Sequence, residues 1–225
     1  MSGLTDRAGG EPPEMGAAVE RAHQAWQESM LRQIETLRQD AQSRAPQLLA
    51  DRCGGSYRNA QLQLSYWGKL VSLSWPDLKA GYEPDGVPVS VFDTAMMLYY
   101  LATADGVPMA DRWIGYRELP DGAFYANAFQ GYSGDRLARI FGERQQAYGS
   151  AAQALEGMHL PGLPGLAYAF QPLPRIRLAT VLYPGDEEFS ARGIVLFDAA
   201  ACHYMPTDGL ALLGSGIVSR LAKKA

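Results

Sequence analysis

Acidic side chains near the end of the chain lie in a pattern that could carry chemistry. Asp186, Glu187 and Glu188 are consecutive, and Asp198 and His203 follow them. Neighbouring carboxylates need water or a cation, because an unpaired buried charge is very costly. They could bind a divalent cation or an amine, or supply a carboxyl group that acts as a general acid or base. The alternative is a hairpin turn whose acids stay hydrated, and the regular acidic spacing of an EF-hand is absent.

Arginine side chains form a second candidate group. Arg117 and Glu118 stand at the end of an expected strand, where an arginine can clamp a carboxylate or a phosphate through two hydrogen bonds. Arg175 and Arg177 are two positions apart in another expected strand, so their guanidinium groups would share one face and suit an anion. The alternative is an ion pair inside the protein, for instance between Arg117 and an acid of the 186–188 turn.

Aromatic residues are concentrated just after residue 122. Phe124 and Tyr125 begin an aromatic-rich segment that continues to Phe129 and Tyr132. Aromatic side chains beside Gly and Asn in a loop can form the walls of a pocket for a planar ligand. The alternative is that these rings belong to the hydrophobic core.

The two cysteines, Cys53 and Cys202, are far apart and form no C-x-x-C pair. The spacing of a zinc ribbon or of an iron–sulfur cluster is therefore missing, and no metal ligand is predicted. Cys202 is next to His203, but neighbouring side chains on a helix or strand point apart, so this pair does not indicate a catalytic dyad. We expect both thiols to be free and structural.

Three segments are expected to position these side chains. Residues 1–16 are rich in Gly and Pro and predict a disordered tail. Residues 17–53 predict a helical segment, in which apolar residues such as Ile34 and Leu37 recur every three or four positions. Residues 54–225 predict a single α+β domain.

The pattern within that domain combines strands and helices. Alternating apolar and polar residues predict strands at 62–66 and 70–75, joined as a hairpin. The run 91–104 is apolar nearly all round, which is typical of a buried helix, and Ser90 is expected to be its N-cap. Ser133 is expected to cap a later helix. Strands cluster without regular βαβ alternation, so the predicted fold class is α+β: an antiparallel or mixed sheet flanked by helices, with one central buried helix.

The composition excludes several classes of protein. Of the 225 residues, 47% are hydrophobic and 20% are charged, which argues against global disorder. The formal net charge of −4 argues against a protein that coats nucleic acid, so no nucleic-acid partner is predicted. No apolar run is long enough to span a membrane, and the N-terminus lacks the apolar core of a secretory signal, so we expect a cytoplasmic protein.

Several separated blocks resemble one known family. They include Asp105-Gly106, Trp113-Ile114 and the run from Gly185 to Phe189. Together they are similar to a bacterial and archaeal domain family of unknown function. Some of its members are joined to a cysteine-rich iron–sulfur segment of the kind found in corrinoid proteins of anaerobic one-carbon metabolism. The resemblance implies a corrinoid or other tetrapyrrole context, although residues 1–50 of this chain contain no cysteine for a cluster.

We expect the distant arginine, acidic and aromatic groups to converge on one hollow. The predicted ligand-binding residues are Arg117, Glu118, Phe124, Tyr125, Arg175, Arg177, Asp186, Asp198 and His203. The first hypothesis is a non-catalytic binding or accessory protein for a bulky anionic or planar small molecule, such as a corrinoid or a haem-like tetrapyrrole. The alternatives are a small enzyme with a carboxylate acid/base or divalent-metal site, and a module that binds a partner protein through the N-terminal helix.

Overall fold

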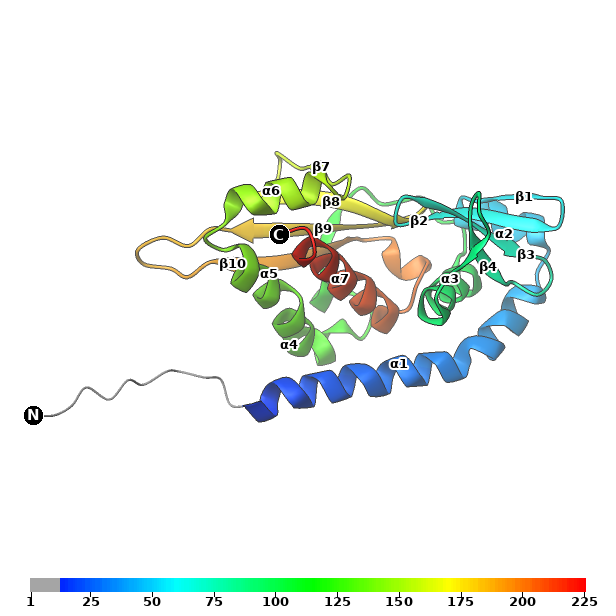
Figure 1. Ribbon diagram of the computed structural model, residues 1–225, viewed down its shortest axis with the longest axis horizontal. Helices are drawn as coiled ribbons and strands as arrows, with labels where there is room; N and C mark the ends of the chain where they lie inside the picture. Colours follow the sequence, from blue (N-terminus) through cyan, green and yellow to red (C-terminus); the bar gives the residue numbers. More distant parts are fainter. Residues whose placement is uncertain (1–12) are drawn as a thin grey trace, which may run out of the picture.

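Two antiparallel sheets lie end to end in the computed structural model, which describes residues 13–225 (Figure 1). In the first sheet the strand order follows the sequence: β1 (Ser56–Arg58), β2 (Gln61–Tyr66), β3 (Lys69–Ser74), β4 (Ala80–Tyr82) and β5 (Val87–Pro88). Leu62, Leu64 and Tyr66 are buried along β2 and alternate with more exposed residues. The predicted hairpin of β2 and β3 is therefore confirmed.

The second sheet joins strands from distant parts of the chain. Its order is β6 (Trp113–Gly115), β10 (Arg192–Asp198), β9 (Ile176–Tyr183), β8 (Leu166–Leu173) and β7 (Met158–His159). The short β6 pairs with β10 so that Trp113 lies opposite Asp198. This pairing brings the loop that precedes β6 to the end of β10.

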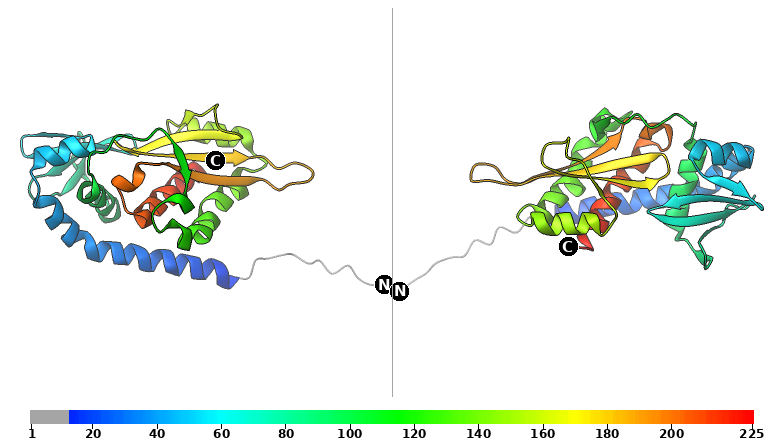
Figure 2. Two further views of the ribbon diagram at one scale, coloured as in Figure 1. Left: turned by 180° about the vertical axis from the view of Figure 1, so that it is seen from behind. Right: turned by 90° about the horizontal axis from the view of Figure 1, so that it is seen from above.

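A long N-terminal helix runs along one side of the molecule, past α3 (Figures 1 and 2). This helix, α1 (Pro13–Gln42), begins at Pro13 rather than at residue 17. Residues 1–12 of the expected tail lie outside the described residues. Ile34 and Leu37 are partly buried against the core and Ala41 is fully buried, so the C-terminal part of the apolar stripe packs on the chain itself.

The second helix, α2 (Pro46–Cys53), ends where the predicted helical segment 17–53 ends. Proline stands in its first turn, where its missing N–H costs no hydrogen bond. Gly54 has a φ of 69° and ends the helix in the left-handed conformation that glycine adopts most easily.

The third helix, α3 (Val91–Thr103), is the buried helix that the sequence predicts. The Ser90 Oγ accepts the N–H of Asp93 at 3.0 Å, which is the expected N-cap. All residues from 94 to 101 are buried. The Tyr99 hydroxyl donates to Gln33 Oε1 at 2.5 Å and ties α3 to α1.

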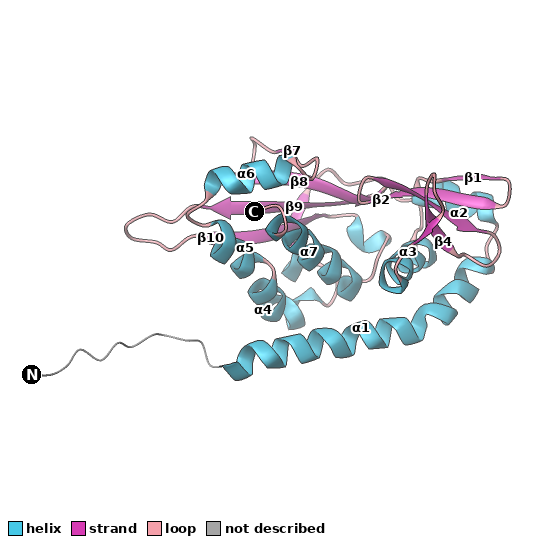
Figure 3. Cartoon of the chain, viewed as in Figure 1, coloured by secondary structure: helices cyan, strands magenta, loops and turns pink. Residues whose placement is uncertain are grey.

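Further helices accompany the second sheet (Figure 3). They are α4 (Gly122–Tyr132), α5 (Gly134–Phe141), α6 (Gln145–Gln153) and α7 (Thr207–Ala222). Ser133 does not cap α5, because its Oγ donates back to Phe129 O at 2.5 Å. The helices and antiparallel sheets confirm the α+β class. No helix within residues 13–225 is both long and apolar enough to cross a membrane.

Candidate functional site

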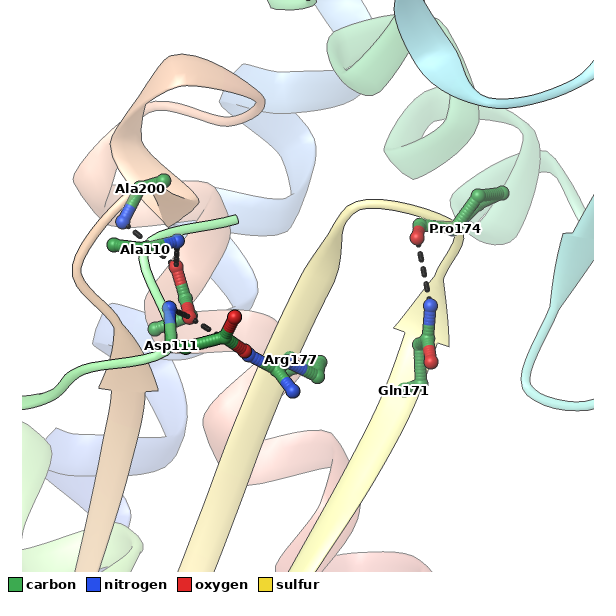
Figure 4. Close-up of polar contacts among 7 residues, drawn as sticks. Ala110, Asp111, Gln171, Pro174, Arg177 and Ala200 are labelled. Carbon is green, nitrogen blue, oxygen red and sulfur yellow. Dashed lines mark hydrogen bonds and ion pairs between the residues drawn. The ribbon is translucent and has the colours of Figure 1, made fainter. Parts of the chain in front are cut away.

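Asp198, at the end of β10, has only 1% of its surface exposed. Its carboxylate accepts the backbone N–H groups of Ala110, Asp111 and Ala200, each at 2.9 Å (Figure 4). Burial alone would raise the pKa of Asp198, but these N–H groups and Arg177 together lower it below its ordinary value. With four hydrogen bonds the carboxylate is saturated, so its role is to hold the loop before β6 against β10.

Arg177 is paired inside the protein. Its Nη2 forms ion pairs with Asp111 and, at 3.1 Å, with Asp198. The guanidinium carbon also lies 5.7 Å from the centroid of the Trp113 ring. The internal ion pair, which was the alternative for the arginines, is thus what the structure shows at Arg177.

Arg175 precedes β9 and has different surroundings from Arg177. Its backbone N–H donates to the Tyr100 hydroxyl at 3.0 Å, and that hydroxyl donates to Cys53 O at 2.5 Å. Cys53 is fully buried, and burial raises the pKa of its thiol to about 11, so the thiolate form is disfavoured. Both cysteines are free, as expected.

His203 and Asp186 lie at opposite ends of β10, because one follows the strand and the other precedes it. The Nδ1 of His203 is 2.7 Å from Asp105 Oδ2, and both side chains are exposed. Burial would raise the pKa of Asp105, but hydrogen bonds from Val107 N–H and from His203 lower it. Asp186 Oδ1 instead accepts N–H groups of its own turn, whose residues are exposed.

The remaining predicted residues are on the surface. Arg117 is exposed and forms no hydrogen bond or ion pair with any described residue. Glu118 Oε1 accepts the N–H of Gly115 at 2.7 Å, and 95% of the Phe124 side chain is exposed. The predicted residues therefore do not converge on one hollow, because the strands carry them to different ends of the second sheet and α4 turns Phe124 outward.

A pocket of about 720 Å³ lies between α4 and the first half of α7, which are neighbours in Figure 1. Tyr125 is the predicted residue that lines it. We call it the tyrosine pocket, because its walls include Tyr116, Tyr125 and Tyr132, with Cys202, Met205 and Leu212 completing the apolar lining. Its lining is thus aromatic and aliphatic, as in many small-molecule sites.

Ring contacts through Phe129 connect the three tyrosines. Tyr116 stacks on Phe129, with the ring centroids 4.2 Å apart, and the Tyr125 and Tyr132 rings are 6.1 Å apart. Burial raises the pKa of Tyr116 to about 12, with smaller contributions from Asp208 and Tyr125. Burial likewise raises the pKa of Tyr132. The hydroxyls of Tyr116 and Tyr132 therefore stay protonated at neutral pH and can donate hydrogen bonds.

The polar groups around the tyrosine pocket are acidic or neutral. Asp121 and Asp208 contribute carboxylates, and Thr207 contributes a hydroxyl that donates to Pro120 O at 2.6 Å. Of the described residues that line the pocket, none is Lys, Arg or His. The predicted arginines therefore provide no charge here, and the lining does not suit a strongly anionic ligand.

Sequence reasoning missed most of this pocket. Tyr116 and Cys202 were not considered as wall residues, because they come from different segments that only tertiary packing brings together. One signal was present: Asp208, Ala211 and Leu212 recur at helical spacing on one face of α7. A carboxylate beside small and apolar residues on one helix face is consistent with a face that lines a partly polar pocket.

Comparison with known proteins gives a family without a described activity. Within residues 13–225, no group of three or more His, Cys, Asp or Glu side chains is arranged to hold a metal ion. No curated protein and no solved structure matches the chain. A family model described as a domain of unknown function matches residues 45–220, from the start of α2 into the last turns of α7. Because this match covers most of the sequence, the chain belongs to that family, DUF3786.

Proposed function

We propose that this protein is a non-catalytic ligand-binding domain that binds a planar, neutral or cationic small molecule in the tyrosine pocket. The observation that carries the proposal is a pocket of about 720 Å³ whose walls include three tyrosines. Its volume lies within the roughly 300–1,000 Å³ that is usual for small-molecule sites. Stacked or edge-on aromatic walls favour a ring system, because aromatic pairs attract beyond their simple burial.

The charge of the lining narrows the class of ligand. The carboxylates of Asp121 and Asp208 give the pocket lining a negative charge. A neutral or cationic ring therefore suits the pocket better than an anion. The tyrosine and threonine hydroxyls favour a ligand that carries polar groups at its edge. Among tetrapyrroles, a corrinoid with amide side chains therefore fits better than haem with its propionates.

Two other functions have less support from the described residues. The acids of the 186–188 turn are exposed, and Asp186 is occupied by the N–H groups of that turn. Asp198 is saturated by its hydrogen bonds. For the N-terminal helix, the buried Ala41 and the bond from Tyr99 to Gln33 favour packing on the chain itself.

The test is direct binding of a corrinoid and of haem. The purified full chain is incubated with hydroxocobalamin or haemin and passed over a desalting column, and the visible spectrum of the protein fraction is recorded. We expect corrinoid bands to be retained with the protein and haem to be retained less. Tyr125→Ala removes one pocket wall and should weaken corrinoid binding at least tenfold.

The matched control is Phe124→Ala. Phe124 is the adjacent aromatic residue on α4, is 95% exposed and does not line the tyrosine pocket. Binding should be unchanged in this variant. A spectrum without retained colour in the unmodified protein, or an equal loss in both variants, would contradict the proposal.

A further inference from the structure

A second hollow, of about 830 Å³, lies where the two sheets meet. Its walls are the β2–β3 turn, the end of β8, the residues just after α6 and the C-terminal part of α7. The backbone N–H of Trp67 donates to Pro172 O at 2.9 Å, which joins the first sheet to β8, and Figure 2 shows the two sheets adjoining there. We call this hollow the intersheet cleft; its chemistry comes from Trp67, Lys69, Tyr82, Glu156 and Arg220.

The β2–β3 turn places a tryptophan in a backbone conformation that bulky residues rarely adopt. Trp67 has a φ of 50° and Gly68 a φ of 77°, and the flanking Tyr66 and Lys69 are paired in the sheet. Two positive φ values match a type I′ turn, whose first central position is ordinarily Asn, Asp or Gly. Unfavourable conformations of this kind cluster at functional sites. Here the conformation puts the indole on the cleft wall.

Two cations line the cleft, and each lies on an aromatic face. The guanidinium carbon of Arg220 is 4.0 Å from the centroid of the Trp67 ring, and Lys69 Nζ is 5.2 Å from the centroid of the Tyr82 ring. Within the part of the chain that the structure describes, neither cation forms an ion pair. Glu156 is the one carboxylate of the described cleft lining, which leaves an excess positive charge.

Trp67 lines the cleft, whereas its indole N–H is buried. Trp67 Nε1 is buried and makes no hydrogen bond of ordinary geometry with a described residue. The neighbouring Tyr66 hydroxyl donates its own proton to Asp93 Oδ1 at 2.6 Å, and its oxygen interacts with this indole N–H as an acceptor.

We propose that the intersheet cleft binds a small organic anion that carries a flat ring. The oxyanion, either a carboxylate or a phosphate ester, lies between Arg220 and Lys69, where two cations meet one negative charge. The ring lies against the apolar part of the wall, which Phe170 and Ile217 provide. Phosphate and carboxylate are the groups that an arginine fork recognises best. This site differs from the tyrosine pocket in sign of charge and in the segments that form it.

The test uses simple probes on the isotope-labelled full chain. Benzoate and phenyl phosphate are titrated while the indole ¹H–¹⁵N signals are followed by NMR, and the Trp67 signal is identified by its loss in Trp67→Asn. We expect the Trp67 signal to shift with both ring anions, and the tighter of the two identifies the oxyanion. Acetate, inorganic phosphate and uncharged benzamide should bind at least tenfold more weakly.

Variants locate the binding. Arg220→Gln and the exposed Lys69→Gln should each weaken binding of the ring anion at least tenfold, whereas Lys79→Gln, just before β4 and outside the cleft, should not. Tyr125→Ala should leave this binding unchanged, which separates it from the tyrosine pocket. The proposal is overturned if the Trp67 signal does not move at millimolar probe, if benzamide binds equally well, or if Lys69→Gln and Arg220→Gln bind as the unmodified protein does.

Discussion

Asp198 is the residue with the clearest structural role. It is buried, and its two oxygens accept three backbone N–H groups and one arginine. In Asp198→Asn an NH₂ group must face at least one of these donors, so buried groups lose their partners. We expect the free energy of unfolding at pH 7 to fall by about 3 kcal/mol. Urea denaturation measures this, and Asp186→Asn, which keeps its acceptor oxygen in an exposed turn, is the matched control.

The same residue gives a pH dependence with a definite sign. The pKa of Asp198 is lower in the folded protein than its ordinary value of 3.8. Its contribution to stability is therefore complete above that value and is lost as the pH falls through the lower folded pKa. Acidification below about pH 4 should destabilise the unmodified protein more steeply than Asp198→Asn. If the free energy of unfolding fell equally with pH in both proteins, Asp198 would not contribute to this pH dependence.

Glycines determine how closely one helix approaches the second sheet. A Cβ added to Gly193 of β10 would lie 2.3 Å from Gly134 O, and one added to Gly134 of α5 would lie 2.3 Å from Gly193 O. A methyl group in this contact must push the helix away from the strand. Gly193→Ala should therefore lower the free energy of unfolding by about 2 kcal/mol.

Gly131→Ala is the control for Gly193→Ala, because it adds a methyl group to a glycine outside the close contact. Gly131 lies in α4, and a Cβ there would meet no atom within 4 Å. Gly131→Ala should raise the free energy of unfolding by about 0.5–1 kcal/mol, because alanine loses less backbone entropy in a helix. Thermal unfolding of both variants tests the pair. If Gly193→Ala were as stable as Gly131→Ala, the close contact between α5 and β10 would contribute nothing to the free energy of unfolding.

Elements with strong local signals were predictable from the sequence. The limits of α2 and the cap of α3 follow from Pro46, Gly54 and Ser90, each of which acts on its own neighbours. The helix α4 was not predicted, because its mixture of Ala, Gly and aromatic residues has no clear polar face. The division of the strands into two sheets was not predictable either, since the pairing of β6 with β10 depends on contacts between distant segments.

The same limit applies to the candidate site. Asp198, Arg177 and Tyr125 could be selected by residue type, but their partners could not. Asp111 comes from an irregular loop, and Tyr116 meets Tyr125 only because α4 folds back over the preceding turn. A sequence pattern reports which side chains can do chemistry, whereas tertiary packing decides which of them meet.

Cooperative unfolding of the whole molecule depends on contacts that connect the two sheets. The buried apolar residues form one continuous core that includes strands of both sheets. Within it, the Tyr100 hydroxyl donates to Cys53 O, beside the first sheet, and accepts the N–H of Arg175 in the β8–β9 turn of the second. A continuous core predicts that both sheets unfold in one cooperative transition, as expected if residues 54–225 form a single domain.

Tyr100→Phe tests this coupling while keeping the ring. The substitution leaves a buried C=O and a buried N–H unpaired, so the free energy of unfolding should fall by about 2–4 kcal/mol. Native-state hydrogen exchange reports the opening free energy of each strand. In the unmodified protein the most protected amides of β2 and β9 should open with the same free energy. In Tyr100→Phe, β2 should open with a lower free energy than β9, because one of the links between the first sheet and the second is lost.

Tyr148→Phe distinguishes coupling from a general loss of stability. Tyr148 is as deeply buried as Tyr100. Its hydroxyl donates to Thr180 O at 2.9 Å, which joins α6 to β9 and does not involve the first sheet. This variant should lower the opening free energies of β2 and β9 by the same amount, since it removes a bond without separating the sheets. If Tyr100→Phe also lowered both equally, the hydroxyl would contribute stability alone, and the continuous core would suffice to make the two sheets one folding unit.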